Sequence, residues 1–129
     1  MGGGTLAFAV HEAGQVESAA SMRPGVAGAP RIRSHTSGSI ANNGVWDLSA
    51  IVTSTHGVIH VQNDAATHYG IFMLRGGVNL TTEMLDAFGN MSVTSGTAGS
   101  VNIYYSAGYK LENKSGSART FSILEVTNG

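Results

Sequence analysis

The sequence predicts an all-β protein, an antiparallel β-sandwich of jelly-roll-like type with an extended N-terminal arm. Three observations indicate this fold class. Short runs of β-branched and aromatic residues recur at intervals of about 8 to 12 residues. Gly, Ser, Thr and Asn separate these runs, as tight turns between strands require. The clearest alternation of polar and apolar residues comes last, between Thr97 and Val126.

The composition of the chain fits one small domain. Its 129 residues have the length of a single domain, and 42% of them are hydrophobic, which is enough to form a core. Charged residues make up only 12%, about half of the usual share. The chain has no cysteine, which excludes disulfides and thiolate metal sites. No apolar run approaches the length of about eighteen residues that a membrane span needs, so we expect no membrane contact.

The N-terminal part differs from the rest. We expect residues 1–38 to form an arm with loops and residues 39–129 to form the β-sandwich domain. Thr5–Val10 has the pattern of a short strand, and His11–Met22 shows a weak helical stripe. Both prolines of the chain follow within this arm and break any regular element. An arm of this kind contacts neighbouring subunits, although a linker or an irregular sheet edge fits equally well. The candidate assembly contacts are Leu6, Phe8, Arg23, Arg31 and Arg33.

The middle of the chain contains the first strands of the predicted domain. Asn42–Gly44 is a turn signal, because Asn and Gly tolerate positive φ. Ala50–Thr55 and Val58–Gln62 have strand patterns. His68–Arg75 carries apolar residues on both faces, which predicts a central strand. Val78–Phe88 fits a strand or a single helical turn, and both interpretations stay open.

Three strand-like runs make up the end of the chain. They are Val101–Tyr105, Tyr109–Glu112 and Arg119–Thr127, joined by short polar connections. Connections of two to five residues join antiparallel neighbours, so the three runs predict an antiparallel meander. The residues expected to pack in the core or between subunits are Trp46, Ile103, Tyr105, Phe121 and Ile123.

The stretch GTAGSVNIYYSAGYKLENKSGSARTFSILEV, which starts at Gly96, resembles the C-terminal β-sandwich modules of bacteriophage tail-fibre and head-decoration proteins. The shared features are a Gly-Thr-Ala-Gly turn and paired strands that end in a hydrophobic edge. The resemblance covers about the last quarter of the chain. It implies a non-enzymatic virion protein, made in the host cytoplasm and assembled as a homotrimer with the major capsid protein or other virion subunits. Since the chain is short for a tail fibre, a capsid decoration (cement) protein is favoured over a fibre tip or receptor-binding head.

No motif in the chain predicts catalysis, so we expect no enzyme, no catalytic residue, no cofactor and no metal. The Gly-x-Ser-x-Gly elbow and the phosphate-binding P-loop are both absent. His56 and His60 share a strand face but lie roughly 13 Å apart, too far to bind one metal ion. A four-residue hairpin loop at residues 63–66 would place His60 opposite Tyr69 and turn His68 to the other face.

The charge and the aromatic content of the chain bear on two further classes of partner, nucleic acid and carbohydrate. The formal net charge of −1 gives no basic surface for nucleic acid, and we expect none to bind. A carbohydrate-binding module, with a cell-surface glycan as partner, is a further alternative. Its stacking residues would be Trp46, Tyr69, Tyr104, Tyr105 and Tyr109. Core and interface packing uses the same residue types and is the favoured interpretation.

Overall fold

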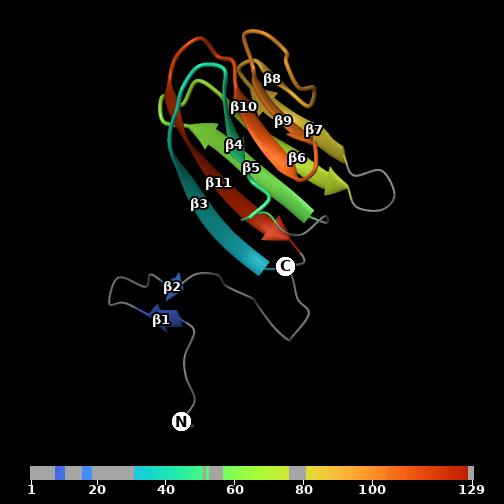
Figure 1. The fold of residues 1–129 in the computed structure, drawn as a ribbon. Helices are drawn as coiled ribbons and strands as arrows, with labels where there is room; N and C mark the ends of the chain where they lie inside the picture. The colour runs from blue at the N-terminus through green and yellow to red at the C-terminus, as the bar shows by residue number, and fades with distance from the viewer. Residues whose placement is uncertain are drawn as a thin grey trace, which may run out of the picture.

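The computed structural model describes residues 8–10, 16–18, 31–50, 52, 57–75 and 81–127. Within these ranges the chain forms strands, turns and loops and no helix, as Figure 1 shows, so the predicted all-β class is confirmed. The described part of the chain accordingly contains no helix long and apolar enough to cross a membrane.

The larger sheet has five strands in the order β3-β11-β5-β6-β7, and all neighbouring pairs are antiparallel (Figure 1). These strands are β3 (Arg31–Ile40), β5 (Gly57–Asn63), β6 (Tyr69–Arg75), β7 (Thr81–Phe88) and β11 (Arg119–Thr127). The strand β6 lies between β5 and β7, which confirms the central position predicted from its two apolar faces.

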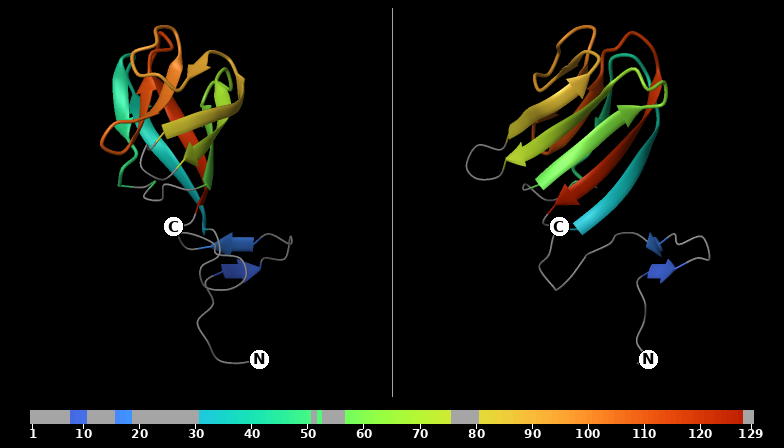
Figure 2. Two further views of the ribbon diagram at one scale, coloured as in Figure 1. Left: turned by 90° about the vertical axis from the view of Figure 1, so that its right-hand side faces the viewer. Right: turned by 180° about the vertical axis from the view of Figure 1, so that it is seen from behind.

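The smaller sheet has four strands in the order β4-β10-β9-β8, and Figure 2 shows both sheets from two further sides. Its strands are β4 (Gly44–Asp47), β8 (Met91–Ser92), β9 (Val101–Tyr105) and β10 (Tyr109–Asn113). The short β8 pairs with β9 in parallel, whereas the other pairs are antiparallel. A separate antiparallel pair consists of β1 (Phe8–Val10) and β2 (Val16–Ser18).

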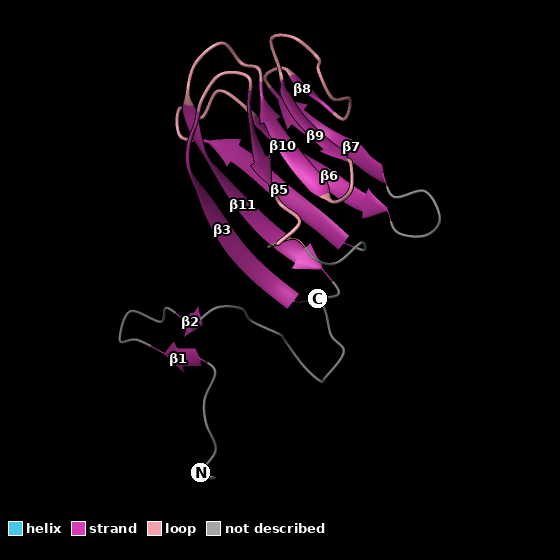
Figure 3. Ribbon diagram, in the orientation of Figure 1, coloured by secondary structure: helices cyan, strands magenta, loops and turns pink. Residues whose placement is uncertain are grey.

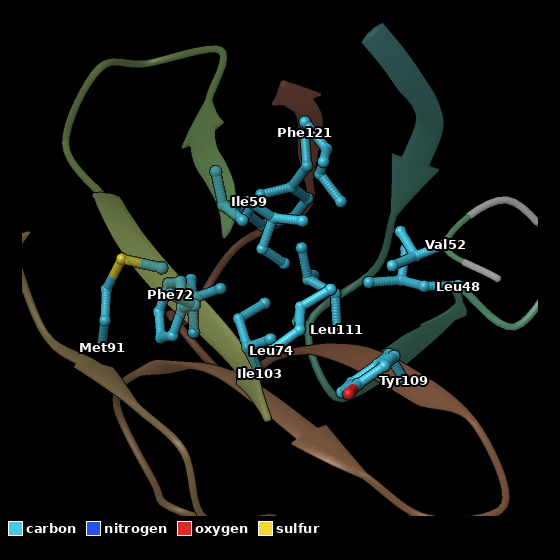
Figure 4. Packing of buried hydrophobic residues seen from close by; sticks show 13 residues of the cluster. Leu48, Val52, Ile59, Phe72, Leu74, Met91, Ile103, Tyr109, Leu111 and Phe121 are labelled. Atoms are coloured by element: carbon cyan, nitrogen blue, oxygen red, sulfur yellow. The ribbon is translucent and has the colours of Figure 1, made fainter. Parts of the chain in front are cut away.

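The two larger sheets share one hydrophobic core. Ile59, Phe72 and Phe121 of the five-stranded sheet and Ile103 and Leu111 of the four-stranded sheet are fully buried in it (Figure 4). Burial of each such side chain stabilises the fold by roughly 1.5 to 3 kcal/mol. A hydrogen bond also joins the layers, because the Thr82 hydroxyl donates to the Ile103 carbonyl at 2.7 Å. The inward faces of the two sheets are therefore held together by packing and by this polar contact.

The last three strands differ from the predicted meander. The strands β9 and β10 form the expected antiparallel hairpin, but β11 crosses to the other sheet and lies between β3 and β5. The crossing begins at Asn113, whose buried amide donates to the carbonyls of Ile40 and Ser117, at 2.9 Å each. A short connection thus joins strands that are close in space without placing them in one sheet.

Four other segments also differ from expectation or lie partly outside the described residues. Residues 31–38, expected in the arm, form most of β3, because polar residues of this strand pair inward with a buried partner on β11. Val78–Phe88, left open between strand and helix, contains strand β7, which Figure 3 draws among the other strands. Within His11–Met22 the described residues 16–18 are strand β2, not helix. Of Ala50–Thr55 only residues 50 and 52 are described, and neither lies in a strand.

Candidate functional site on the outer face of the five-stranded sheet

The register of the five-stranded sheet arranges its outward side chains in three parallel rows across β3, β11, β5, β6 and β7. The first row is Ile32, Val126, Val58, Met73 and Glu83. The second row is Ser34, Leu124, His60, Ile71 and Asp86. The third row is Thr36, Ser122, Gln62, Tyr69 and Phe88. The rows change in character from apolar to polar and aromatic, so this face carries two distinct surfaces.

The first surface, here termed the outer apolar patch, consists of Ile32, Val58, Met73, Leu124 and Val126. The first row is apolar across four adjacent strands, and Leu124 extends it into the second row. Leu124 is 46% exposed and Val126 is 40% exposed. A strand with one face in the core normally carries polar residues on the other. Continuous exposed apolar surface on a small domain indicates a contact with another molecule.

The second surface is a shallow hollow towards the β7 edge, here termed the Tyr69 hollow. Its lining residues are His60, Tyr69, Gly70, Ile71, Asp86 and Ala87. The cross-strand pair Gly70 and Ala87 lies between the second and third rows. Both positions face the core, so the hollow lies over the backbone of this pair. The ring of Phe88 stacks on Tyr69 at a centroid distance of 5.2 Å. His60 meets Tyr69 edge-on at 6.3 Å.

The outer face of the four-stranded sheet is polar by comparison. Lys110 on β10 donates to Asp47 on β4 at 3.0 Å. Hydrogen bonds from the backbone and side chain of Ser49, and then from Lys110, lower the pKa of Asp47 to about 2. The only large hydrophobic side chain described as exposed on the three longer strands of this face is Val45, at 48%. The two outer faces of the protein therefore differ in the partners that they favour.

A loop that follows β8 covers part of this polar face. Glu112 on β10 accepts hydrogen bonds from the Gly96 amide at 2.7 Å and from the Asn102 side chain at 2.8 Å. Asn102 also donates to the Thr97 carbonyl at 3.1 Å and accepts a short hydrogen bond from the Ser100 hydroxyl. Burial alone would raise the pKa of Glu112, but these hydrogen bonds outweigh it and lower the pKa. The Oε1 atom of Glu112 thus anchors the loop.

A second buried carboxylate lies on the inward face of the five-stranded sheet. Glu125 is 0% exposed and accepts hydrogen bonds from Arg33, His35 and Thr127. Burial would raise the pKa of Glu125, but the hydrogen bond from Arg33 leads a set of favourable contacts that lower it. This cluster holds the edge strand β3 in register on β11. Both carboxylate oxygens of Glu125 accept hydrogen bonds within this cluster.

The structure places the predicted site residues in several different regions. Ile103, Phe121 and Ile123 lie in the core, and Trp46 and Tyr105 pack against it. Arg31 and Arg33 lie on the inward side of β3 opposite Thr127 and Glu125, so the three predicted arginine contacts do not form one outward cluster within the described residues. Phe8 lies in strand β1. Leu6 and Arg23 lie outside the described residues.

The described histidines do not converge. His60 and Tyr69 share the outward face and their rings meet edge-on. The predicted pairing of His60 with Tyr69 is wrong, because the register pairs Gln62 with Tyr69 and His60 with Ile71. His68 bonds to the hairpin loop through Thr67, and burial and the charge of Arg119 lower its pKa. Across the described ranges no three His, Asp or Glu side chains are grouped to hold a metal ion. His11 and His56 lie outside those ranges.

The aromatic residues considered for sugar stacking do not share one surface. Tyr105 and Tyr109 contact each other at 5.1 Å on the core side, and only Tyr69 lies on the outward face of the five-stranded sheet. The stacking partner of Tyr69 is Phe88, which sequence reasoning missed. In the sequence, Leu124 and Val126 alternate with Phe121, Ile123 and Glu125 and give the last strand a second apolar face. That pattern fits a covered strand as well as an exposed patch.

Comparisons of the chain with protein-family models, with curated proteins and with solved structures find no match. The functional argument therefore rests on the geometry of the two surfaces on the outer face.

Proposed function

We propose that this chain is a non-enzymatic structural protein of a bacteriophage virion, a capsid decoration (cement) protein that binds the outer shell as a homotrimer. The resemblance of residues 96–126 to phage head-decoration modules supports the proposal. The roles of the two buried carboxylates support it as well. Glu125 holds strand β3, and Glu112 holds a loop. The finer fold belongs to the same proposal: a jelly-roll-like β-sandwich, with the segment before β3 as an arm that contacts neighbours.

The outer apolar patch is the observation that carries this proposal. Its side chains come from four neighbouring strands, so it forms one continuous surface on a rigid sheet. Association gains free energy chiefly by removing such apolar surface from water. Among the described residues of this outward face, Arg75 and Glu83 pair at 3.1 Å, and Asp86 lies in the hollow and not in the patch. A partner can therefore cover the patch without desolvating an unpaired charge.

The first test of the proposal is the oligomeric state of the purified full chain. Sedimentation equilibrium should show a trimer, and Val126→Ser should shift the chain towards the monomer because a polar group then replaces apolar contact area. Val45→Ser is the matched control, since it makes the same change on the opposite outer face at similar exposure (48% against 40%). A monomeric parent chain, or equal effects of the two substitutions, would count against assembly through the patch.

The second test addresses the virion itself. Purified protein is added to phage shells that lack it, and bound protein and shell disruption temperature are measured. We expect saturable binding and greater heat resistance with the parent chain, and weaker binding with Val126→Ser. A chain without residues 1–30 should bind less well while the remaining sheets stay folded. If a shell gains neither bound protein nor heat resistance, the decoration role is wrong.

A further inference from the structure

The Tyr69 hollow combines an aromatic platform with polar groups, which the outer apolar patch lacks. Tyr69 is 42% exposed and Phe88 is 56% exposed, although aromatic side chains of this size are usually more buried. Their rings are nearly parallel, with an interplanar angle of 13°. Stacking covers one face of each ring, and the exposed remainder of Tyr69 lines the depression in the sheet.

Three polar side chains lie beside this platform, and one of them is oriented by a hydrogen bond. Asp86 lies opposite Ile71, and its Oδ1 atom accepts the amide hydrogen of Ala87 at 2.9 Å, which orients the carboxylate. Within the described ranges the Oδ2 atom of Asp86 has no hydrogen-bond partner, so it is available as an acceptor. The imidazole of His60 lines the hollow as well. Gln62 is exposed and pairs with Tyr69, so its side-chain amide lies beside Tyr69 in the third row.

The chemistry of these groups selects a class of ligand. Among the described residues no lysine or arginine lines the hollow, so an anionic ligand finds no counter-charge from them. A hydroxyl-rich neutral ring can place its apolar face on Tyr69 and donate hydroxyl hydrogens to Asp86, while His60 and Gln62 each offer a donor and an acceptor. A small cation would use the carboxylate and the aromatic rings but would leave the amide and the imidazole without a role. Concave sites with apolar walls and a few placed polar groups are typical of small-ligand binding.

We infer that the Tyr69 hollow binds a neutral pyranoside, with the sugar ring stacked on Tyr69 beside Phe88 and its hydroxyl groups bonded to Asp86 and His60. The hollow lies at the β7 end of the second and third rows and adjoins the outer apolar patch, because its lining residue His60 pairs with Leu124 of the patch. The inference goes beyond the assembly role and does not depend on it. On a decorated shell, such a site would attach the particle to glycan.

The test is a titration of the isotopically labelled full chain, followed by amide chemical shifts. The probes are the methyl β-glycosides of glucose, galactose and N-acetylglucosamine, with tetramethylammonium chloride as the cation probe. At least one glycoside should cause saturable shifts at the amides of Gly70, Ile71 and Ala87. Because a stacking contact contributes on the order of 1 kcal/mol, Tyr69→Ala should weaken binding about fivefold.

Matched variants separate binding from loss of structure. Tyr104→Ala makes the same change on the outer face of the four-stranded sheet and should leave affinity unchanged. Asp86→Ala should weaken binding about tenfold or more, because a hydrogen bond to a charged group is lost. Unchanged shifts elsewhere in the spectrum show that each variant is folded. The inference is overturned if none of the glycosides shifts these amides, if only tetramethylammonium does so, or if they respond only to protein concentration.

Discussion

Arg33 on β3 and Glu125 on β11 lie directly opposite each other and share two hydrogen bonds, at 2.9 Å from Nε and 3.1 Å from Nη2. The Glu125 side chain is 0% exposed and that of Arg33 is 16% exposed. A charged pair thus takes the place of apolar contacts on the inward face where β3 joins the sheet. Such a pair specifies the register of the edge strand, because a shift of one residue would leave a buried carboxylate without its partner.

The first prediction concerns this pair. Glu125→Gln should lower the free energy of unfolding by about 2 to 4 kcal/mol, because it removes the buried negative charge that compensates Arg33. Urea denaturation followed by circular dichroism measures the change. Glu83→Gln is the control, since Glu83 pairs with Arg75 on the surface and is 48% exposed. Surface pairs contribute less than about 1 kcal/mol. Equal losses in the two variants would contradict the role assigned to Glu125.

The second prediction concerns the pH dependence of stability. The pKa of Glu125 and of Glu112 is lowered in the folded chain from an ordinary value of 4.5. The stabilisation from each group is therefore fully present above pH 4.5 and is lost as the pH falls through the folded pKa. Urea denaturation at about pH 7, 5, 4 and 3 should show a stability that declines only in the acid range. Glu125→Gln should make that decline smaller, and an unchanged slope would argue against it.

The third prediction concerns the loop over the four-stranded sheet. Replacing Glu112 by Ala removes the acceptor of the Gly96 amide and of the Asn102 side chain, so the loop should open more often. Hydrogen exchange followed by NMR should show faster exchange at Gly96, with little change at Ile59 in the other sheet. Lys110→Ala is a control on the same strand and outer face, because it breaks only the pair with Asp47. If Gly96 exchanges at the same rate in both variants, the anchor is elsewhere.

The sequence predicts the strands better than their arrangement. Alternation over residues 101–113 correctly predicts the β9–β10 hairpin, since its side-chain pattern is local. The transfer of β11 to the other sheet depends on Asn113, whose hydrogen bonds reach Ile40, a residue distant in the chain. Residues 31–38 lack apolar alternation because Arg33 and His35 satisfy a buried carboxylate, and a polar strand of this kind resembles a loop in sequence.

The candidate surfaces are harder to predict for a related reason. Phe88 comes at the end of a segment that fits strand or helix, and only the register of β7 on β6 places its ring on Tyr69. The bulge between Ile71 and Phe72 shifts that register by one residue on β7, which also sets Asp86 opposite Ile71. Irregularities of this kind redirect side chains without a clear signal in a single sequence.

The last prediction concerns Tyr109, which is 2% exposed and contributes its ring to the core. Its hydroxyl is buried and has no hydrogen-bond partner within the described part of the chain. Burial, together with the neighbouring Tyr105, raises the pKa of this hydroxyl. A buried polar group without a partner costs free energy, so Tyr109→Phe should leave the protein equally stable or stabilise it by about 1 kcal/mol. Tyr109→Ala, which also removes the ring, should cost about 3 to 5 kcal/mol. Urea denaturation compares the two, and a loss of more than about 1 kcal/mol in Tyr109→Phe would show that the hydroxyl has a stabilising partner.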